Sequence, residues 1–144
     1  MYIDEIKEAA SYIQSRYHEP LDLAIVLGSG LGPLADQIKN PVVIYYKDIP
    51  HFPQSTIKGH EGKLYLGELN GKHIAVMKGR VHYYEGHSSK SITLCIRVFR
   101  ALNIRKLILT NACGGIREDL MPGQITLISD HISFLCPSPL IGPN

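Results

Sequence analysis

The sequence predicts an α/β fold with a mixed central β-sheet flanked by helices, and three features indicate it. Two apolar runs, 21–28 and 106–115, each lead into a glycine-rich turn, as strands buried on both faces of a sheet do. Asn70-Gly71 separates two more strand-like segments and is a strong signal for a β-hairpin. Two further segments carry apolar residues at the three- and four-residue spacing of amphipathic helices. A chain of 144 residues has the usual size of one domain, so we expect a single domain over residues 1–144.

The first half of the chain is expected to alternate between helix and strand. The first apolar helix face is made of Ile3, Ile6, Ala9, Ala10 and Ile13. Pro33 follows a glycine turn and favours a helix start, because proline is well placed in a first helical turn. In chain order we expect this first helix to end near His18-Glu19-Pro20, followed by the strand 21–28, the helix from Pro33, the strand 41–48 and a long loop over 49–62.

The second half is expected to supply the hairpin, one helix and two more strands. The hairpin joins the segments 63–69 and 73–79. The second apolar helix face is made of Ile92, Cys95, Ile96, Phe99 and Leu102, with Ser88 or Ser89 as the cap of a helix over 88–102. The run 106–115 is expected to be a buried strand, and 124–132 a last strand after the turn at Met121-Pro122-Gly123.

Composition and charge exclude several classes of protein. The apolar share is 44%, and 15 basic residues against 13 acidic ones give a net charge of +2 without a basic stripe, so a nucleic-acid partner is not expected. No apolar run approaches the roughly 18 residues that a membrane helix needs, and the charged N-terminus is unlike a signal peptide. Cys95, Cys113 and Cys136 are odd in number and widely spaced, which favours a reduced, cytoplasmic setting. The histidines show no zinc-ligand spacing, so no metal is expected.

The glycine turn Gly28-Ser29-Gly30-Leu31-Gly32 is a candidate anion site. It follows a strand and precedes a helix, and small residues there free backbone amides for an anion. A turn that merely connects strand and helix is the alternative. A nicotinamide-dependent oxidoreductase built on Gly28, Gly30 and Asp48 is a weaker possibility, because the dinucleotide fingerprint requires glycine where Pro33 stands.

The stretch Gly79-Arg80-Val81-His82-Tyr83-Tyr84-Glu85-Gly86 has more bulky titratable groups than a turn requires. The guanidinium of Arg80 offers a planar fork of donors that suits an oxyanion. In extended backbone His82 and Tyr84 share its face, and Glu85 is placed to hold the Arg or the His. We therefore expect a site for phosphate or another small anion here, and a solvated polar turn is the alternative.

Two other segments are candidates. His60 lies between glycines in the long loop, where a histidine is either functional or merely solvated. Asn111-Ala112-Cys113-Gly114-Gly115 leaves a strand through small residues, which lets a flat ligand approach the backbone. Cys113 as a nucleophile has no activating partner nearby in the sequence, and a structural thiol is the alternative.

Taken in order, the motifs GSGLG, GHEG, GRVHYYEG and NACGGI, followed by PGQITLISDHI and PLIGPN, form a specific combination. From about residue 20 to the last residue, the chain resembles the trimeric purine nucleoside phosphorylases. The related methylthioadenosine phosphorylases look less similar through the H-x-Y-E-G stretch and are the nearest alternative. The resemblance implies the phosphorylase/hydrolase-like (nucleoside phosphorylase) fold, a homotrimer and a role in purine salvage.

The resemblance also implies roles for single residues. Phosphate would be bound by Ser29, His60, Arg80, His82, the backbone of Val81 and the amide of Ala112. Ribose would be contacted by Tyr84 and His60, and the purine by Ala112, Cys113 and Gly114, cysteine being a mild departure from the small residue usual there. His82 and Glu85 would be catalytic, with Glu85 orienting the Arg and the His.

The implied reaction is phosphorolysis of a purine ribonucleoside or deoxyribonucleoside to the free base and the sugar 1-phosphate. Inorganic phosphate is the co-substrate, and no metal or organic cofactor is implied. The family's chain continues for about as long again beyond Asn144, and its distal half carries the groups that recognise the purine. We therefore expect an N-terminal half with its C-terminal portion missing, which is catalytically incomplete on its own. A non-catalytic anion-binding or assembly module is the alternative from another class.

Overall fold

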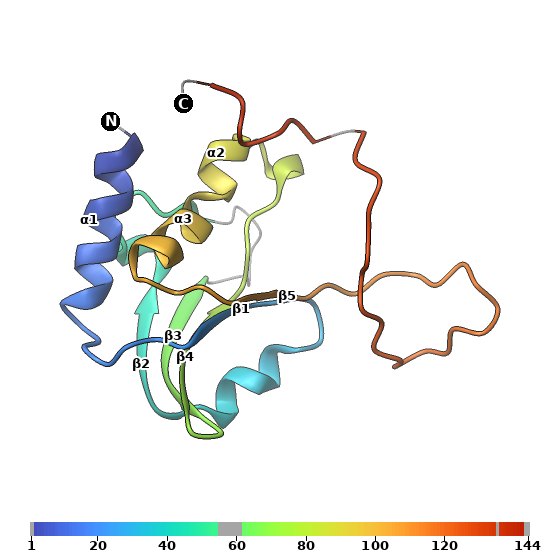
Figure 1. Ribbon diagram of the computed structural model, residues 1–144, viewed down its shortest axis with the longest axis horizontal. Coiled ribbons are helices and arrows are strands. Elements are labelled where there is room, and N and C mark those ends of the chain that lie inside the picture. The colour runs from blue at the N-terminus through green and yellow to red at the C-terminus, as the bar shows by residue number, and fades with distance from the viewer. Residues whose placement is uncertain (1, 55–61, 135, 143–144) are drawn as a thin grey trace.

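The structure, a computed structural model, describes residues 2–54, 62–134 and 136–142. A five-stranded mixed sheet lies at the centre, with helices on both sides (Figure 1). The α-helices are α1 (Tyr2–Gln14), α2 (Ser89–Ile92) and α3 (Leu94–Ala101), and the 3-10 helices are η1 (Gly32–Gln37), η2 (Tyr46–Asp48) and η3 (Tyr83–Glu85). The strands are β1 (Leu23–Leu27), β2 (Lys39–Tyr45), β3 (Lys63–Leu69), β4 (Lys72–Lys78) and β5 (Leu107–Leu109). The predicted fold class is confirmed.

The sheet has the strand order β2-β3-β4-β1-β5. β1 is parallel to both β4 and β5, whereas β3 is antiparallel to β2 and β4. The predicted hairpin is confirmed: Asn70 and Gly71 have φ values of 50° and 72°, the positive values that a two-residue turn of this kind requires. The carboxyl ends of the parallel strands β4, β1 and β5 meet at one edge of the sheet, which is where ligands bind in open α/β sheets.

The central strands are buried on both faces, as their unbroken apolar runs predict. Ala24 and Val26 face the cluster formed with α1 and α3, while Ile25 and Leu27 face the smaller cluster under η1. Figure 1 shows α1 and α3 on one side of the sheet and η1 on the other. The position of η1 also confirms the helix start at Pro33, which lies in its first turn.

The helices follow the predicted pattern with shifted ends. α1 buries Ala9, Ala10 and Ile13, but Ile3, expected on the same face, is 66% exposed. The helix expected over 88–102 is divided at Thr93 into α2 and α3, and Ser88 caps it by accepting a hydrogen bond from the amide of Ser91 at 3.1 Å. None of the helices in the described residues has the length and hydropathy needed to cross a bilayer.

Of the two strand predictions for the last third of the chain, one is wrong and the other is confirmed only in part. The segment 124–132 forms no strand, and Ile125 and Leu127 along it are 98% and 93% exposed. β5 covers only three residues of the run 106–115 and is exposed rather than buried. The physical reason is shared: β5 is the edge of the described sheet, with β1 as its only neighbour there, and no described strand lies beyond it to pair with 124–132.

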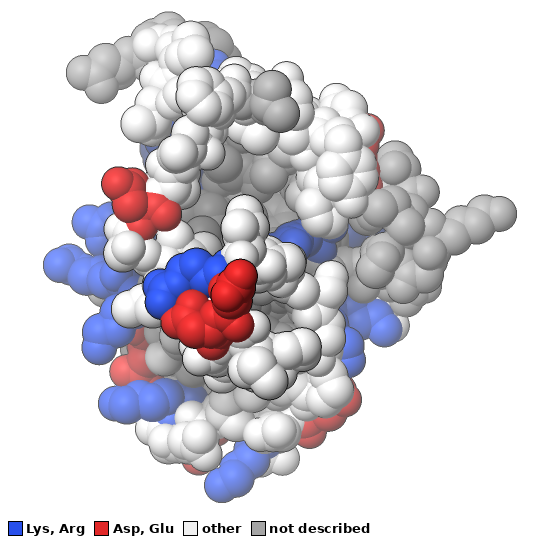
Figure 2. All heavy atoms as spheres, turned by 90° about the vertical axis from the view of Figure 1, so that its right-hand side faces the viewer, with Lys and Arg blue, Asp and Glu red and all other residues white. Residues whose placement is uncertain are grey.

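The segment that follows β5 extends away from the sheet (Figure 1). Figure 2 faces this side of the molecule, and uncharged side chains drawn in white occupy much of its surface. The exposed apolar residues of the segment are Ile116, Met121, Ile125, Leu127, Ile128, Ile132 and Phe134. β2 shows a smaller departure from prediction, because Tyr46–Asp48 leaves the expected strand as η2.

Two buried titratable groups, Cys95 and Tyr46, make stability depend on alkaline pH. Burial raises the pKa of Cys95 from 9.0 to about 11, against weaker opposing hydrogen bonds from the backbone. Burial, followed by the proximity of Cys95, raises the pKa of Tyr46 well above its usual range. A raised pKa in the folded state means that stability is fully present below pH 9 and is lost as the pH rises towards 11.

We expect the free energy of unfolding to fall by about 2–3 kcal/mol through Cys95 alone between pH 8.5 and 11, at about 1.4 kcal/mol per pKa unit. Urea unfolding at several pH values measures it, with Cys95→Ala as the control that removes this thiol. The difference between the two proteins should shrink as the pH rises. Parallel stability profiles for wild type and Cys95→Ala would contradict the expectation.

Candidate active site

Three loops meet at the carboxyl edge of the parallel strands. Gly28–Gly32 follows β1, Gly79–Gly86 follows β4, and Thr110–Gly115 follows β5. Because β1 lies between β4 and β5 in the sheet, its loop is the centre of the group. Three of the four segments that sequence patterns marked as candidates are therefore brought to one place by the topology of the sheet.

The loop after β4 is shaped by its two glycines. Gly79 and Gly86 have φ values of 98° and 90°, in the left-handed region that glycine adopts without strain. Between them Tyr83–Glu85 forms η3, which ends with the amide of Gly86 bonded to the carbonyl of Tyr83. This turn replaces the fully extended backbone expected at its C-terminal end, and it returns Glu85 to the side of His82.

Arg80, His82 and Glu85 form a hydrogen-bonded chain. Arg80 Nε donates to His82 Nε2 at 3.1 Å. Oε1 of Glu85 lies 3.0 Å from His82 Nδ1 and accepts the backbone amide of His82 at 2.7 Å. Because Arg Nε is always a donor, Nε2 of a neutral His82 is the acceptor and its proton sits on Nδ1, facing the carboxylate. For Nε2 to donate to an anion, the imidazole must gain a second proton or turn from Arg80.

Glu85 holds this arrangement from inside the protein. Its side chain is only 2% exposed, whereas that of His82 is 32% exposed. A buried carboxylate that accepts two hydrogen bonds from one residue fixes the position of that residue strongly. Glu85 thus contacts both the backbone and the ring of His82, the geometry that an orienting role towards His82 would require.

Arg80 is half-buried, and some of its N–H donors have no partner among the described residues. Its Nη1 donates to the carbonyl of Thr110 at 3.0 Å, and its Nε is used by His82. Two of the five N–H groups of a guanidinium are occupied in this way. Among the described residues no carboxylate lies within ion-pair distance of Arg80. A partly buried cation without a carboxylate partner in the described chain is suited to bind an anion.

The neighbours of this chain differ in exposure. The ring of Tyr84 stacks on His82 with a centroid distance of 4.8 Å and an interplanar angle of 15°, and the residue is 74% exposed. Val81 is buried at 8% exposure, so its side chain packs into the protein and is not available to a ligand. Tyr84 is therefore placed to contact a ligand bound beside His82, while Val81 is not, except through its main chain.

The glycine turn after β1 has fewer backbone amides available for an anion than the sequence suggests. The amide of Gly28 donates to Thr110 Oγ1 at 2.8 Å, and the carbonyl of Gly28 accepts the amide of Leu31 at 3.2 Å. Gly28 is buried, while Ser29 and Gly30 are exposed and Gly30 has a φ of 85°. The hydroxyl and amide of Ser29 and the amide of Gly30 remain the groups of this turn that an anion could use.

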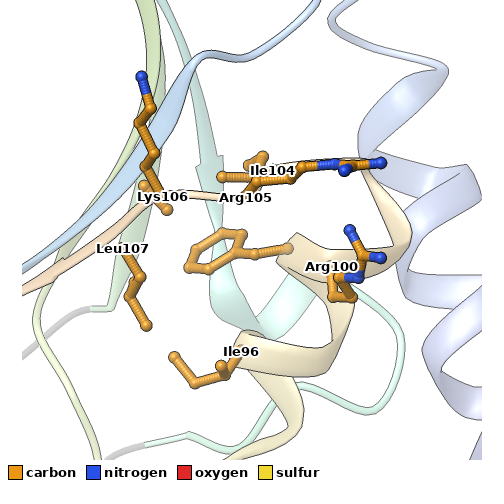
Figure 3. Close-up of a pocket in the computed structure, with 8 residues that line it drawn as sticks. Ile96, Arg100, Ile104, Arg105, Lys106 and Leu107 are labelled. Carbon is orange, nitrogen blue, oxygen red and sulfur yellow. The ribbon is translucent and has the colours of Figure 1, made fainter.

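The remaining candidates are less well defined. Ala112, Cys113 and Gly114 are exposed and lie in irregular backbone after β5. His60 lies outside the described residues. A hollow of about 450 Å³ between α3 and β5 takes none of its lining from the three loops, as the side chains of Ile96, Arg100 and Leu107 in Figure 3 illustrate. It is therefore separate from the candidate site. The described residues contain no cluster of three His, Cys, Asp or Glu side chains that could hold a metal.

Two residues of the site were missed from the sequence. Thr110 contacts both neighbouring loops, through Gly28 and Arg80. The hydroxyl of Tyr46 donates to the carbonyl of Gly79 at 2.7 Å from a buried position and so fixes the start of the Arg80 loop. The signal for Thr110 was a hydroxyl at the end of an apolar strand; for Tyr46 it was a tyrosine at an expected strand end. Neither pattern is specific.

Comparison with known proteins gives a family. The model of the phosphorylase superfamily matches residues 22–144. The chain belongs to this superfamily. Purine nucleoside phosphorylase 1 of Bacillus subtilis is 48% identical over 141 residues, which are 98% of this chain and 52% of the relative. Purine nucleoside phosphorylase of Rattus norvegicus is 40% identical over 144 residues, which are 98% of this chain and 50% of the relative.

Solved structures of the superfamily share the fold. A purine nucleoside phosphorylase in complex with ribose-1-phosphate matches with a TM-score of 0.78 and 41% identity, over 83% of this chain and 44% of the other. Isoform 2 from Schistosoma mansoni, in complex with cytosine and ribose-1-phosphate, matches with a TM-score of 0.76 and 44% identity, over 81% and 41%. The phosphorylase superfamily chain described here thus spans about half the length of the curated relatives it matches.

Proposed function

We propose that this chain carries the phosphate- and ribose-binding part of a purine nucleoside phosphorylase. The observation that carries the proposal is the Arg80-His82-Glu85 chain at the carboxyl edge of the sheet, in which Arg80 has no carboxylate partner among the described residues. Relatives at 40–48% identity bear the name of this enzyme, and a related structure holds ribose-1-phosphate. This sugar phosphate is a product of phosphorolysis.

The reaction needs an anionic nucleophile held in line with a poor leaving group. A phosphate oxygen forms a bond to C1′ of the sugar while the bond from C1′ to the purine breaks, and the electron pair leaves with the base, which takes up a proton. The sugar passes through a cationic transition state, so a fixed anion beside it both attacks and stabilises charge. Inorganic phosphate is the co-substrate, and the proposal involves no other cofactor.

Each residue of the candidate site is assigned a role from its position in the site. Arg80 supplies the charge and the donors that hold phosphate, with Ser29 and, once it has a proton on Nε2, His82 completing the set. Glu85 keeps His82 in place. Tyr84 stacks on His82, next to the proposed phosphate, where it would contact the ribose. Ala112, Cys113 and Gly114 would approach the purine, and His60 would approach phosphate and sugar. A homotrimer, implied by the family resemblance, and a cytoplasmic location, favoured by the cysteine usage, remain predictions.

A non-catalytic anion-binding module is the second candidate. The observation that favours it is the exposure of Ala112, Cys113 and Gly114, which leaves the proposed purine face open to water in the described chain. A base in such a place has few groups to hold or protonate it. On this alternative the chain binds phosphate and does not bind nucleosides.

Calorimetry and an activity assay separate these readings. We expect saturable binding of inorganic phosphate, weak binding of inosine, and little or no ribose 1-phosphate from inosine by the 144-residue chain. Inosine binding that appears only with phosphate bound favours the enzyme over the module. Robust ribose 1-phosphate production would show that the chain is catalytically complete, and faster turnover of methylthioadenosine than inosine would favour the methylthioadenosine phosphorylases. Absence of saturable phosphate binding would refute the shared phosphate site.

A further inference from the structure

We infer that Thr110 is a positioning residue of the phosphate site, joining the loop after β1 to the loop after β4. The inference rests on the proposed function, because it assigns Thr110 a role in holding Arg80 and the Ser29 turn. Thr110 is half-buried at the end of β5, and its three polar groups all have partners. No motif marks it, and it has no place among the site residues expected from the sequence.

The hydroxyl of Thr110 fixes the turn after β1. Oγ1 donates to the carbonyl of Val26 at 2.9 Å and accepts the amide of Gly28 at 2.8 Å. The amide of Thr110 donates to the same Val26 carbonyl at 3.1 Å, which continues the pairing of β5 with β1. A hydroxyl has one hydrogen, so its only donor is used by Val26 and it has no proton to offer to phosphate. Thr110 therefore acts through Gly28 and not on the anion.

The carbonyl of Thr110 fixes the direction of Arg80. It accepts Nη1 at 3.0 Å, while His82 Nε2 accepts Nε at 3.1 Å. These two acceptors sit at different nitrogens of the planar guanidinium, so they fix its plane as well as its position. Three N–H groups of Arg80 have no hydrogen-bond partner among the described residues. An Arg held at two points loses less side-chain entropy when an anion binds, which strengthens the binding.

The hydroxyl and the carbonyl belong to one residue, and this couples the two loops. If Thr110 is displaced, its carbonyl, which accepts from Arg80, and its hydroxyl, which accepts from the amide of Gly28, move together. Valine has the shape of threonine without the hydroxyl, and it would leave the buried amide of Gly28 without this acceptor. Serine keeps the hydroxyl and loses only a methyl group. The pair Thr110→Val and Thr110→Ser therefore separates the hydrogen bond from packing.

Calorimetry with inorganic phosphate tests the inference. We expect Thr110→Val to weaken phosphate binding by about tenfold, the effect of one lost buried hydrogen bond, and Thr110→Ser to stay within about twofold of wild type. Urea unfolding is measured in parallel. A merely structural residue would lower stability and leave the dissociation constant of the folded protein unchanged. Equal phosphate affinity in folded Thr110→Val and wild type would overturn the inference.

Amide hydrogen exchange of the wild type gives a second readout that needs no variant and no phosphate. The amide of Gly28 should exchange slowly, and an unprotected rate would overturn the inference even if Thr110→Val fails to fold. Failure of the proposed function looks different: wild type and Thr110→Ser would then both bind no phosphate while the Gly28 amide stays protected. In that case Thr110 has no phosphate site to position, and the inference falls together with the function.

Discussion

Replacing Arg80 with alanine is expected to weaken binding of inorganic phosphate by about hundredfold. Hydrogen bonds to a charged group are each worth about 1.5–3 kcal/mol, and about 1.4 kcal/mol corresponds to a tenfold change, so two lost bonds at the lower end of this range give this magnitude. Arg80 combines partial burial with the absence of a carboxylate partner among the described residues. Its removal also frees His82 Nε2 and the carbonyl of Thr110 from their donor.

Two other variants separate charge from geometry. Arg80→Lys keeps a positive charge but lacks the fork that reaches His82 and Thr110 together, so we expect a loss of about tenfold. Arg16→Ala is the matched control, because Arg16 is an exposed arginine in the turn after α1 and lies over the ring of Tyr12. It should bind phosphate as wild type does. Calorimetry at low ionic strength measures all three. An Arg80→Ala protein within threefold of wild type would refute Arg80 as the main phosphate ligand.

The parts of the fold that were predictable are those decided by local chemistry. Asn70-Gly71 forms its turn because both residues tolerate positive φ, and Ser88 caps its helix through its own side chain. The prediction of a strand over 124–132 was wrong because such a strand depends on a partner elsewhere in the chain. Its apolar residues could be buried only beside a neighbouring strand, and the described sheet ends at β5 without one. Periodicity reports a preference and does not report whether a partner is present.

The candidate site divides in the same way. Arg80, His82 and Glu85 lie within six residues, and their contacts follow from a short turn between two glycines. Thr110 and Tyr46 act over separations of 82 and 33 residues, to Gly28 and Gly79, and such contacts depend on the register of the whole sheet. The same long-range contact consumes the Gly28 amide, which local reasoning had left available for an anion. The structure therefore corrects the expectation that the Gly28 amide is free for an anion, and it shows that Thr110 holds the glycine turn in place.

Gly28→Ala is expected to lower the free energy of unfolding by about 2–4 kcal/mol. A Cβ on Gly28 would lie 2.6 Å from the carbonyl oxygen of Thr110 and 2.7 Å from Cα of Asn111. Both are backbone atoms at the end of β5, so no side chain can move aside, and β1 and β5 must separate there. Overpacking of this kind costs about 1–3 kcal/mol, and loss of the Gly28–Thr110 hydrogen bond adds about 1 kcal/mol.

Gly114→Ala is the control for this effect, since its Cβ would meet nothing within 4 Å and its φ is not among the positive values. We expect its stability to lie within about 0.5 kcal/mol of wild type in urea unfolding. Because Gly28 also lacks a positive φ, an alanine there is opposed by contact alone and not by backbone strain. A Gly28→Ala protein as stable as Gly114→Ala would mean that β5 does not approach β1 this closely. The support that Thr110 gives to both loops would then be lost as well, because it depends on the same approach of the two strands.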